Sequence, residues 1–446
     1  MISASHEQGV PNSASLERDA RLAHADGHAV DPGEIALGVV IGRTSEFFDF
    51  FVYAIGSVLV FPHLFFPDYD PFTGTLYSFA IFSLAFVARP VGSFIFTAID
   101  RRYGRGTKLT IALFLLGGST CAISFLPGYT RIGAEAVVLL ALFRIGQGVA
   151  LGGAWDGLAS LLALNAPEHK RGWYAMMPQL GAPLGFLLAG GLFAFLINSL
   201  PPGDFLEWGW RYPFFVAFAL NVVALFARLR LVATREFANM LNKHELEPVK
   251  ISELVRNDGL SIIIGAFVPL ACFALFHLVT VFPLAWITLN SDRSPANILT
   301  TQMLGAVVAL GAVVLSGIIA DCIGRRRLLA IGAGLIAVFS FAAPLLLAAG
   351  RTGETVFLLL GFALLGLSFG QASGAVASRF ASRFRYTGSA LTSDIAWLVG
   401  AGFAPLVVLA LSSWWGIGAI GGYLLSGAIC TLLALTSNRQ LEMRDT

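Results

Sequence analysis

Three ionisable side chains lie within one apolar stretch near the start of the chain. Arg43, Glu46 and Asp49 are three residues apart, and on a helix this spacing puts them on one broad face. A carboxylate in a dry, partly charged cavity can take up and release a proton, and a guanidinium can hold a carboxylate through two parallel hydrogen bonds. The group could therefore bind an anion or carry a proton. Alternatively, each acid only neutralises an arginine and holds the helices together.

Four further charges stand inside apolar stretches, namely Arg89, Arg144, Asp156 and Asp394. A charge at the bilayer centre costs about 2.5–3.5 kcal/mol on insertion scales, so such a residue faces a partner or a water-filled cavity. Six of these seven charges lie in the first half of the chain, where we expect function to be concentrated. The remaining ionisable residues are assigned to loops, segment ends or tails.

Neighbouring polar and aromatic residues extend this candidate site. Gln147 lies one turn from Arg144, whereas Asp156 lies about 120° around the helix from Arg144 at 100° per residue. His277 is alone in a later apolar segment, where it is either a hydrogen-bond partner between helices or a proton relay. Among the 37 phenylalanines, we expect only those in the run at 47–51 to line a site.

Long apolar runs must position these residues. Of 446 residues, 56% are hydrophobic and 13% are charged, with a mean hydropathy of +0.76, and the charged share is about half that of a soluble protein. A helix of about 20 apolar residues crosses a bilayer. Twelve such segments are predicted, at 35–61, 73–99, 109–127, 134–164, 173–197, 212–233, 260–289, 297–320, 328–349, 354–377, 388–411 and 416–436.

The distribution of basic residues predicts the orientation. Lysine and arginine gather in the loops after every second segment, and the opposite loops hold only Arg131, Arg211, Arg293 and Arg351. Basic loops stay in the cytoplasm, so both termini are predicted to be cytoplasmic in a multi-pass protein of the inner (plasma) membrane. Since the basic residues serve topology, the net charge of +2 gives no indication of nucleic-acid binding.

The longest stretch on the basic side separates six segments from six. The predicted organisation is a disordered cytoplasmic tail at 1–33, an N-terminal six-helix half at 34–233, a cytoplasmic linker at 234–258, a C-terminal six-helix half at 259–437 and a cytoplasmic tail at 438–446. The first tail is polar and lacks the apolar core of a signal peptide.

The two halves echo one another at offsets of roughly 220 residues. Repeated halves place a substrate site at their interface, near the membrane midplane. The corresponding stretches are RRYGRGTK (101–108) with GIIADCIGRRR (317–327), KRGWY (170–174) with FRYTG (384–388), and GAPLG (181–185) with GFAPL (402–406).

The first pair of stretches has the residues of a cytoplasmic gate. A glycine lets two helices meet closely, an aspartate caps a helix or pairs across the loop, and arginines anchor at the headgroups. A simpler reading, in which the arginines only set topology, leaves the spacing of the glycines and aspartates unexplained. The predicted gate residues are Asp100, Arg105, Gly317, Asp321, Gly324 and Arg325.

Several motifs together resemble a known family. They occur in its order, as GRTSEFFDFFVYA (42–54), ARPVG (88–92), RIGQGVALGGAW (144–155), APEHKRGWY (166–174), PQLGAPLG (178–185), WGWRYPF (208–214) and RYTG (385–388). With them the chain resembles the major facilitator superfamily, and more narrowly its metabolite:proton symporter family, over nearly all of its length after residue 33. The resemblance implies an all-α polytopic membrane protein with twelve transmembrane helices in two pseudo-symmetric six-helix halves. It also adds Tyr53 and Gln179, which stand within these motifs, to the candidate site.

The chain departs from the family pattern at four places. Ala154 stands where the family has a glutamate, and Leu164 and Asn165 occupy the place of an acid. In the first loop motif the aspartate is displaced to Asp100, and Thr97 replaces a glycine, while the second loop motif is intact. These changes bear on proton coupling and on the strength of the gate.

Three functions remain open at this point. The resemblance favours a secondary active symporter that imports a small organic acid or zwitterionic metabolite with protons, as a monomer. The missing acid at Ala154 favours instead a proton-independent facilitator or exchanger, and a transporter-fold receptor is the third alternative. We expect no enzyme, cofactor or metal site, because the sequence has no nucleophile, nucleotide or metal motif and its four cysteines are not paired in spacing.

Overall fold

The structure is a computed structural model that describes residues 32–154, 166–232, 248–373, 380 and 382–437, and within these ranges it holds helices and no strands. The predicted tails up to residue 31 and from 438, the linker up to residue 247, and Asp156 lie outside the described residues.

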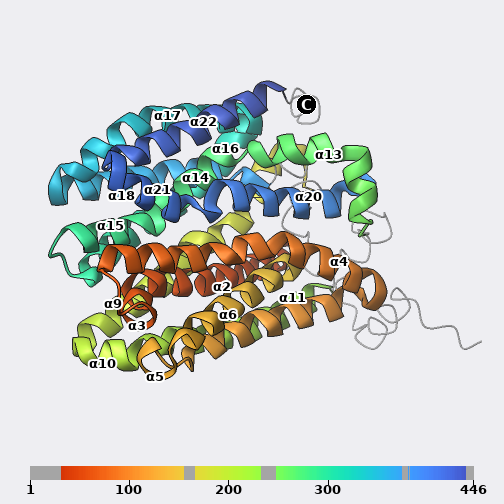
Figure 1. Cartoon of the computed structure of the whole chain (residues 1–446). Helices are drawn as coiled ribbons and strands as arrows, with labels where there is room; N and C mark the ends of the chain where they lie inside the picture. Colours follow the sequence, from red (N-terminus) through yellow and green to blue (C-terminus); the bar gives the residue numbers. More distant parts are fainter. Residues whose placement is uncertain (1–31, 155–165, 233–247, 374–379, 381, 438–446) are drawn as a thin grey trace, which may run out of the picture.

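The first half of the chain forms one helical bundle, drawn from red to yellow in Figure 1. Its long helices are α2 (Pro32–Leu59), α4 (Pro71–Ser124), α6 (Ala134–Ala154), α9 (Gly181–Ser199) and α11 (Tyr212–Val232). Short helices connect them: α3 (Phe61–Phe65), α5 (Tyr129–Ile132), η1 (Glu168–Lys170), α8 (Arg171–Met176), η2 (Met177–Leu180), α10 (Pro202–Glu207) and η3 (Gly209–Arg211).

The second half forms a similar bundle beside the first, drawn from green to blue (Figure 1). It contains α13 (Ile251–Phe267), α14 (Leu270–Thr280), α15 (Phe282–Asn290), α16 (Pro295–Ile323), α17 (Arg325–Ala348), α18 (Gly350–Phe369), α20 (Ser382–Ala396), η4 (Trp397–Gly402), α21 (Ala404–Trp415) and α22 (Gly418–Ser437).

The helices account for twelve membrane crossings. Ten helical segments of the described chain are long and apolar enough to span a bilayer. One of these, α4, has 54 residues and is interrupted at Gly104, so it supplies two crossings. The twelfth is α2, whose apolar stretch carries the three charges Arg43, Glu46 and Asp49. The predicted twelve-helix fold is thereby confirmed.

Two glycine turns show the pseudo-symmetry of the halves. Gly104 and Gly324 both have a positive φ, of 82° and 86°, which a residue without a Cβ adopts at little cost. Each lies where one membrane-crossing helix ends and the next begins, and the two positions are separated by the repeat offset read from the sequence. The gate motifs thus occupy equivalent turns at one end of the molecule.

Glycines bring the crossing helices close enough to position the site. A Cβ on Gly148 or Gly152 of α6 would lie 2.3 Å from the carbonyl oxygen of Ala85 or Arg89 in α4. In the second half, a Cβ on Gly366 of α18 would lie 2.6 Å from a carbonyl oxygen of α16. Small residues permit this backbone contact between membrane helices, so these glycine spacings serve packing.

The seventh predicted segment, 260–289, is not a single helix. It consists of α14 and α15, preceded by the end of α13, with breaks next to Pro269 and Pro283. Proline lacks the backbone N–H that would continue a helix. Every residue of α14 is buried, so this broken segment lies at the centre of the molecule. The end of the predicted linker, 251–258, is already helical as part of α13.

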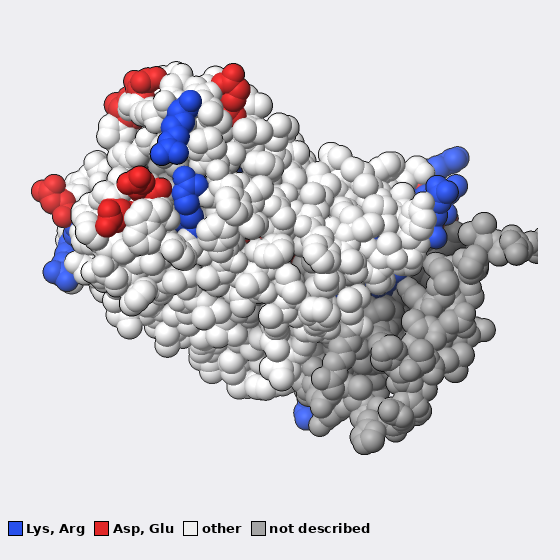
Figure 2. Space-filling model, turned by 90° about the horizontal axis from the view of Figure 1, so that it is seen from below, with Lys and Arg blue, Asp and Glu red and all other residues white. Residues whose placement is uncertain are grey.

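Charged side chains gather at the two ends of the molecule, with an uncharged belt between them on the face shown in Figure 2. We call the end that carries the Gly104 and Gly324 turns the basic end, because Arg101, Arg102 and the run 325–327 lie beside these turns. Elsewhere on the surface, large apolar side chains such as Val338 and Phe341 of α17 are exposed, as expected of helices that face lipid.

Candidate functional site

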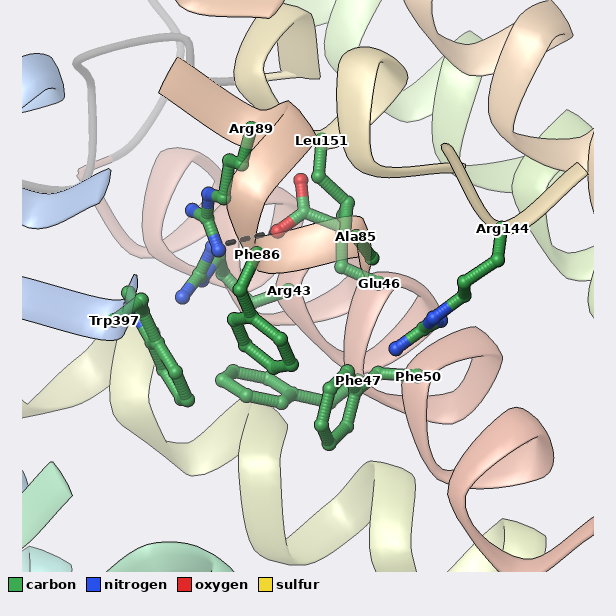
Figure 3. Close-up of a pocket in the computed structure, with 10 residues that line it drawn as sticks. All are labelled: Arg43, Glu46, Phe47, Phe50, Ala85, Phe86, Arg89, Arg144, Leu151 and Trp397. Atoms are coloured by element: carbon green, nitrogen blue, oxygen red, sulfur yellow. Dashed lines mark hydrogen bonds and ion pairs between the residues drawn. The ribbon is translucent and has the colours of Figure 1, made fainter. Parts of the chain in front are cut away.

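A cavity between the two halves is lined by four of the seven charged residues singled out in the sequence. Figure 3 shows the guanidinium of Arg144 pointing into it from the side opposite Arg43 and Arg89, with aromatic rings between them. Among the described lining residues, Trp397 alone comes from the second half, where it begins η4, the one π-helical turn of the described chain. Such turns are frequent at functional sites. The lining residues are Arg43, Glu46, Phe47, Phe50, Ala85, Phe86, Arg89, Arg144, Leu151 and Trp397.

Arg144 is buried without a carboxylate partner among the residues that the structure describes. Its side chain donates from Nε to the carbonyl oxygen of Phe82 at 3.1 Å and from Nη1 to Oε1 of Gln147 at 3.0 Å. The guanidinium carbon lies 3.9 Å from the ring centroid of Tyr53. Both Arg144 Nη2 and the Tyr53 hydroxyl lack a hydrogen-bond partner among the described residues. This edge of the guanidinium is therefore open to an anion.

Asp49 is held by neutral groups from three other helical crossings. Thr120 Oγ1 lies 2.9 and 2.8 Å from its two carboxylate oxygens, and Asn221 Nδ2 donates to Oδ2 at 2.7 Å. Gln147 Nε2 donates to Thr120 Oγ1 at 2.6 Å and lies 3.3 Å from Asp49 Oδ1. Asp49 is thus linked to Arg144 through Gln147, with no ion pair of its own in the described chain.

Glu46 is instead paired with two arginines. Arg43 Nη1 donates to its Oε2 at 2.6 Å, and Arg228 Nη2 donates to Oε1. Arg228 also donates to the carbonyl oxygen of Ala154 at 2.7 Å, beside the position where the family motif has an acid. A buried carboxylate between two guanidiniums is stabilised in its ionised form.

Arg228 corrects one sequence-based assignment. It was placed among the residues at segment ends, but its side chain is buried and contacts Glu46. The last turns of α11 run alongside α2, and Gly42 leaves the space that Arg228 fills, since a Cβ there would lie 2.8 Å from Arg228 Nε. Arg228 stands near the end of an apolar segment, where basic residues usually face the membrane surface, so the sequence did not indicate its contact with Glu46.

Arg89 and Asp394 form an ion pair between the halves. Arg89 Nε donates to Asp394 Oδ1 at 2.6 Å, and the hydroxyl of Ser93, one turn further along α4, donates to Oδ2. Asp394 is therefore the partner of a cavity arginine and does not itself line the cavity. The pair joins α4 to α20, on the side of the cavity toward the basic end.

The intact loop motif joins the halves at the basic end. Asp321 of α16 accepts hydrogen bonds from the backbone N–H groups of Gly172 at 2.6 Å and Trp173 at 3.1 Å, in the first turn of α8. A carboxylate at a helix N-terminus is favourable because the first N–H groups lack partners within the helix. A Cβ on Gly317 would meet Met176 at 2.8 Å, so this glycine permits the contact.

Gln371 reinforces this contact. Its Nε2 donates to the carbonyl oxygen of Gly172 at 3.1 Å, and its Oε1 accepts from Arg325 Nε at 3.4 Å. The gate residues Gly317, Asp321 and Arg325 thus come together around α8, next to the turn at Gly324.

The displaced aspartate of the first loop motif also makes a contact between the halves. Asp100 Oδ2 lies 3.4 Å from Arg105 Nη2 and 3.7 Å from Lys108 Nζ, and accepts from the hydroxyl of Tyr386 at 3.2 Å. Lys108 donates to the same hydroxyl at 2.8 Å. The displacement therefore leaves Asp100 within reach of the second half.

Two other candidates lie away from the cavity lining. Both ring nitrogens of His277 lack a hydrogen-bond partner in the described chain, so the expected bond between helices is absent. Its ring lies among aromatic rings, 5.3 Å from Phe50 and 5.6 Å from Phe86. Gln179 lies in η2, buried, with no partner for Oε1 among the described residues. Asp156 lies outside the described residues.

Two residues of the Asp49 cluster were missed from the sequence. Thr120 and Asn221 lie 71 and 172 residues from Asp49. The signal for Asn221 was its isolation as an amide in the apolar run of α11, since polar side chains in membrane helices seek partners. Thr120 gave no such signal, because a threonine hydroxyl is commonly satisfied by its own helix.

Comparisons with known proteins agree with this architecture. The family model for the Major Facilitator Superfamily matches residues 40–405. The inner membrane metabolite transport protein YhjE of Escherichia coli is 38% identical over 408 residues, covering 90% of this chain and 93% of that protein. The shikimate transporter of Escherichia coli is 31% identical over 426 residues, covering 92% and 94%.

A solved structure shares the fold. The proton:xylose symporter XylE, bound to 6-bromo-6-deoxy-D-glucose, has a TM-score of 0.70 at 19% identity and covers 91% of this chain and 94% of its own. The chain is a member of the major facilitator superfamily, and hence a secondary transporter rather than an enzyme.

Proposed function

We propose that the protein imports a small organic acid or zwitterionic metabolite together with protons, by alternating access of the central cavity to the two sides of the inner membrane. In this proposal the protein acts as a monomer, and both termini and the basic end face the cytoplasm, as the distribution of lysine and arginine favours. The relative that is named a shikimate transporter supports an acid as solute.

The observation that carries this proposal is the guanidinium of Arg144, whose Nη2 has no hydrogen-bond partner among the described residues. Only 1% of this residue is exposed, yet Nη2 has no partner in the described chain and no carboxylate pairs with it. An uncompensated buried charge is costly, and a solute carboxylate would neutralise it. Arg43 and Arg89, the other cavity arginines, already have carboxylate partners in Glu46 and Asp394.

Asp49 is the carboxyl group best placed to carry the proton. Within the described chain its hydrogen-bond partners are all neutral groups, whereas Glu46 is paired with two guanidiniums. The Thr120 hydroxyl lies 3.0 Å from the carbonyl oxygen of Leu116 as well. It can therefore donate to ionised Asp49, or donate to Leu116 and accept from protonated Asp49.

This arrangement couples the proton to the solute. Ionised Asp49 partly balances the charge of Arg144 through Gln147. When Asp49 is protonated that balance is lost, and Arg144 attracts a solute carboxylate more strongly. Proton and anion then enter together. The contacts of Asp321, Asp100 and Asp394 between the halves would act as the cytoplasmic gate that separates once both are bound.

Proteoliposomes test the proposal directly, with labelled shikimate and unlabelled competitors from a panel of small carboxylic acids. An inward pH gradient should drive accumulation by the parent protein, and Arg144→Lys should weaken solute binding at least tenfold, because lysine keeps the charge but loses the planar fork. If Arg144→Lys binds the solutes as tightly as the parent, Arg144 does not hold the carboxylate.

A proton-independent facilitator or exchanger is the second candidate. It is favoured by Ala154 in place of an acid and by the engagement of Glu46 with Arg43 and Arg228, which leaves Asp49 as the one carboxyl group available for coupling near Arg144 in the described chain. Equal solute uptake with and without a pH gradient, alongside normal counterflow, would establish this second function. A receptor of the transporter fold would bind solute without either form of flux.

A further inference from the structure

A second, apolar chamber lies beside the charged cavity, between the two halves. Five of its twelve lining residues are phenylalanines, Phe51 and Phe186 from the first half and Phe276, Phe362 and Phe369 from the second. The other lining residues are aliphatic or small except for one threonine, whose hydroxyl donates to a backbone carbonyl oxygen of its own helix. The chamber therefore offers a solute no unsatisfied polar group.

Phenylalanine rings packed against one another separate the two spaces. Phe47 and Phe50 line the charged cavity, whereas Phe51 and Phe276 line the apolar chamber. The rings of Phe47 and Phe51 stack at 6.2 Å, and those of Phe51 and Phe276 stack at 5.8 Å with an interplanar angle of 11°. A rotamer change among these rings would join the spaces, so a solute held at Arg144 could extend into the chamber.

The charges of the cavity limit the solute to one carboxylate. Arg89 pairs with Asp394 and Arg43 pairs with Glu46, so a second solute carboxylate would have to displace an existing acid. Arg144 lacks a carboxylate partner in the described chain. One carboxylate satisfies it, and the rest of the solute meets aromatic rings.

We infer that the solute is a monocarboxylic acid with a bulky apolar ring, whose carboxylate binds Arg144 and whose ring enters the chamber of Phe51, Phe186, Phe276, Phe362 and Phe369. This inference rests on the proposed transport function and specifies its substrate class. A compact dicarboxylate would leave the apolar chamber empty and bring a second charge against the aromatic rings. A ring in the chamber would remove apolar surface of the solute and of the phenylalanine side chains from water.

The first test is the affinity of the purified parent protein for acids that differ only in the group beside the carboxylate. Acetate, cyclohexanecarboxylate, benzoate, 2-naphthoate and succinate form such a series, measured by calorimetry at one pH. We expect at least tenfold tighter binding of cyclohexanecarboxylate and benzoate than of acetate or succinate, since a hydrophobic pocket discriminates about 10–200-fold per methylene.

Substitutions in the chamber test whether the preference for acids with a ring arises there. Val313→Phe fills the chamber from α16 and should weaken benzoate binding at least tenfold while leaving acetate binding unchanged. Val308→Phe is the matched control, because Val308 lies on the same helix but is 39% exposed on its outer face. Phe362→Leu enlarges the chamber and should shift preference from benzoate toward 2-naphthoate, which gives a second readout if Val313→Phe folds poorly.

Two results would overturn the inference while the transport proposal stands. One is a parent protein that binds acids with the same affinity whether or not they carry a ring, or that prefers succinate. The other is unchanged ring selectivity in both Val313→Phe and Phe362→Leu. A parent protein that binds none of these acids would also overturn the inference, whereas the proposed function fails only if proteoliposomes take up neither shikimate nor any competitor of the panel.

Discussion

At the scale of single residues, the two acids on α2 have different surroundings although they are only three positions apart. Asp49 contacts neutral donors from α4, α6 and α11, and Glu46 contacts two arginines. The two acids lie about one turn apart on the same helix, so their own helix does not explain the difference. It comes from the side chains that other helices place beside each acid, namely Thr120, Gln147 and Asn221 beside Asp49 and Arg228 beside Glu46. This difference separates a candidate proton carrier from a structural ion pair.

Asp49→Asn tests the proton-carrier role. The amide keeps the shape of the neutral acid but cannot titrate, so accumulation driven by a pH gradient should disappear while counterflow persists. In the parent, solute affinity should fall as the pH rises, because ionised Asp49 compensates Arg144; in the variant it should be independent of pH. Binding measured across the pH range, beside uptake, checks both. Retained uphill accumulation in Asp49→Asn would exclude Asp49 as the carrier.

Glu46→Gln should instead damage the protein itself. The change removes the acid that Arg43 and Arg228 share, and breaking a buried ion pair costs about 3–5 kcal/mol. We expect a lower midpoint of thermal unfolding in detergent, with Asp49→Asn as the matched amide substitution that shifts it less. Equal midpoints for Glu46→Gln and the parent would show that Glu46 contributes little to stability.

At the scale of elements, glycine contacts determine where the cavity side chains point. Gly152 brings α6 against α4 at Arg89 and Ser93, which fixes the part of α4 from which Arg89 reaches Asp394 of α20. In the same way, Gly181 and Gly185 bring α9 against α2 next to Arg43 and Phe47. The charged faces are thus fixed by backbone contact between helices.

Gly152→Ala tests this close approach. Its Cβ would lie 2.3 Å from the Arg89 carbonyl oxygen and 2.4 Å from the Ser93 nitrogen, and overpacking of this kind costs about 1–3 kcal/mol. Gly334→Ala in α17 is the control, because a Cβ there meets nothing within 4 Å. We expect a lower unfolding midpoint and reduced uptake for the first variant only. Identical unfolding midpoints for the two variants would contradict the close packing.

At the scale of the whole molecule, the halves meet at the basic end through two unlike contacts. Asp321 accepts two backbone N–H groups across the interface, whereas Asp100 is paired mainly within its own half and reaches Tyr386 through one hydrogen bond. Of the two loop motifs, the one with Asp321 therefore makes the stronger contact between the halves. Since alternating access requires these contacts to break and reform, both bear on transport.

Asp321→Asn should impair transport more than Asp100→Asn. An asparagine at 321 offers only one acceptor oxygen to the two N–H groups of α8, so one of them is left without a bond; at 100, Arg105 and Lys108 remain beside Tyr386. Uptake at matched expression measures the difference. Equal loss at both positions would mean that the displaced Asp100 serves the interface as well as Asp321 does.

The sequence by itself determined the twelve crossings, their repeat and the four charges that line the cavity, because a membrane helix must satisfy its own backbone and apolar length is therefore visible locally. Only the tertiary structure decided the pairing. It placed Arg228 on Glu46, Thr120 and Asn221 on Asp49, and Asp394 on Arg89. These partners lie far apart along the chain, and rotation of one helix by a fraction of a turn would exchange them, which a hydrophobic pattern cannot specify.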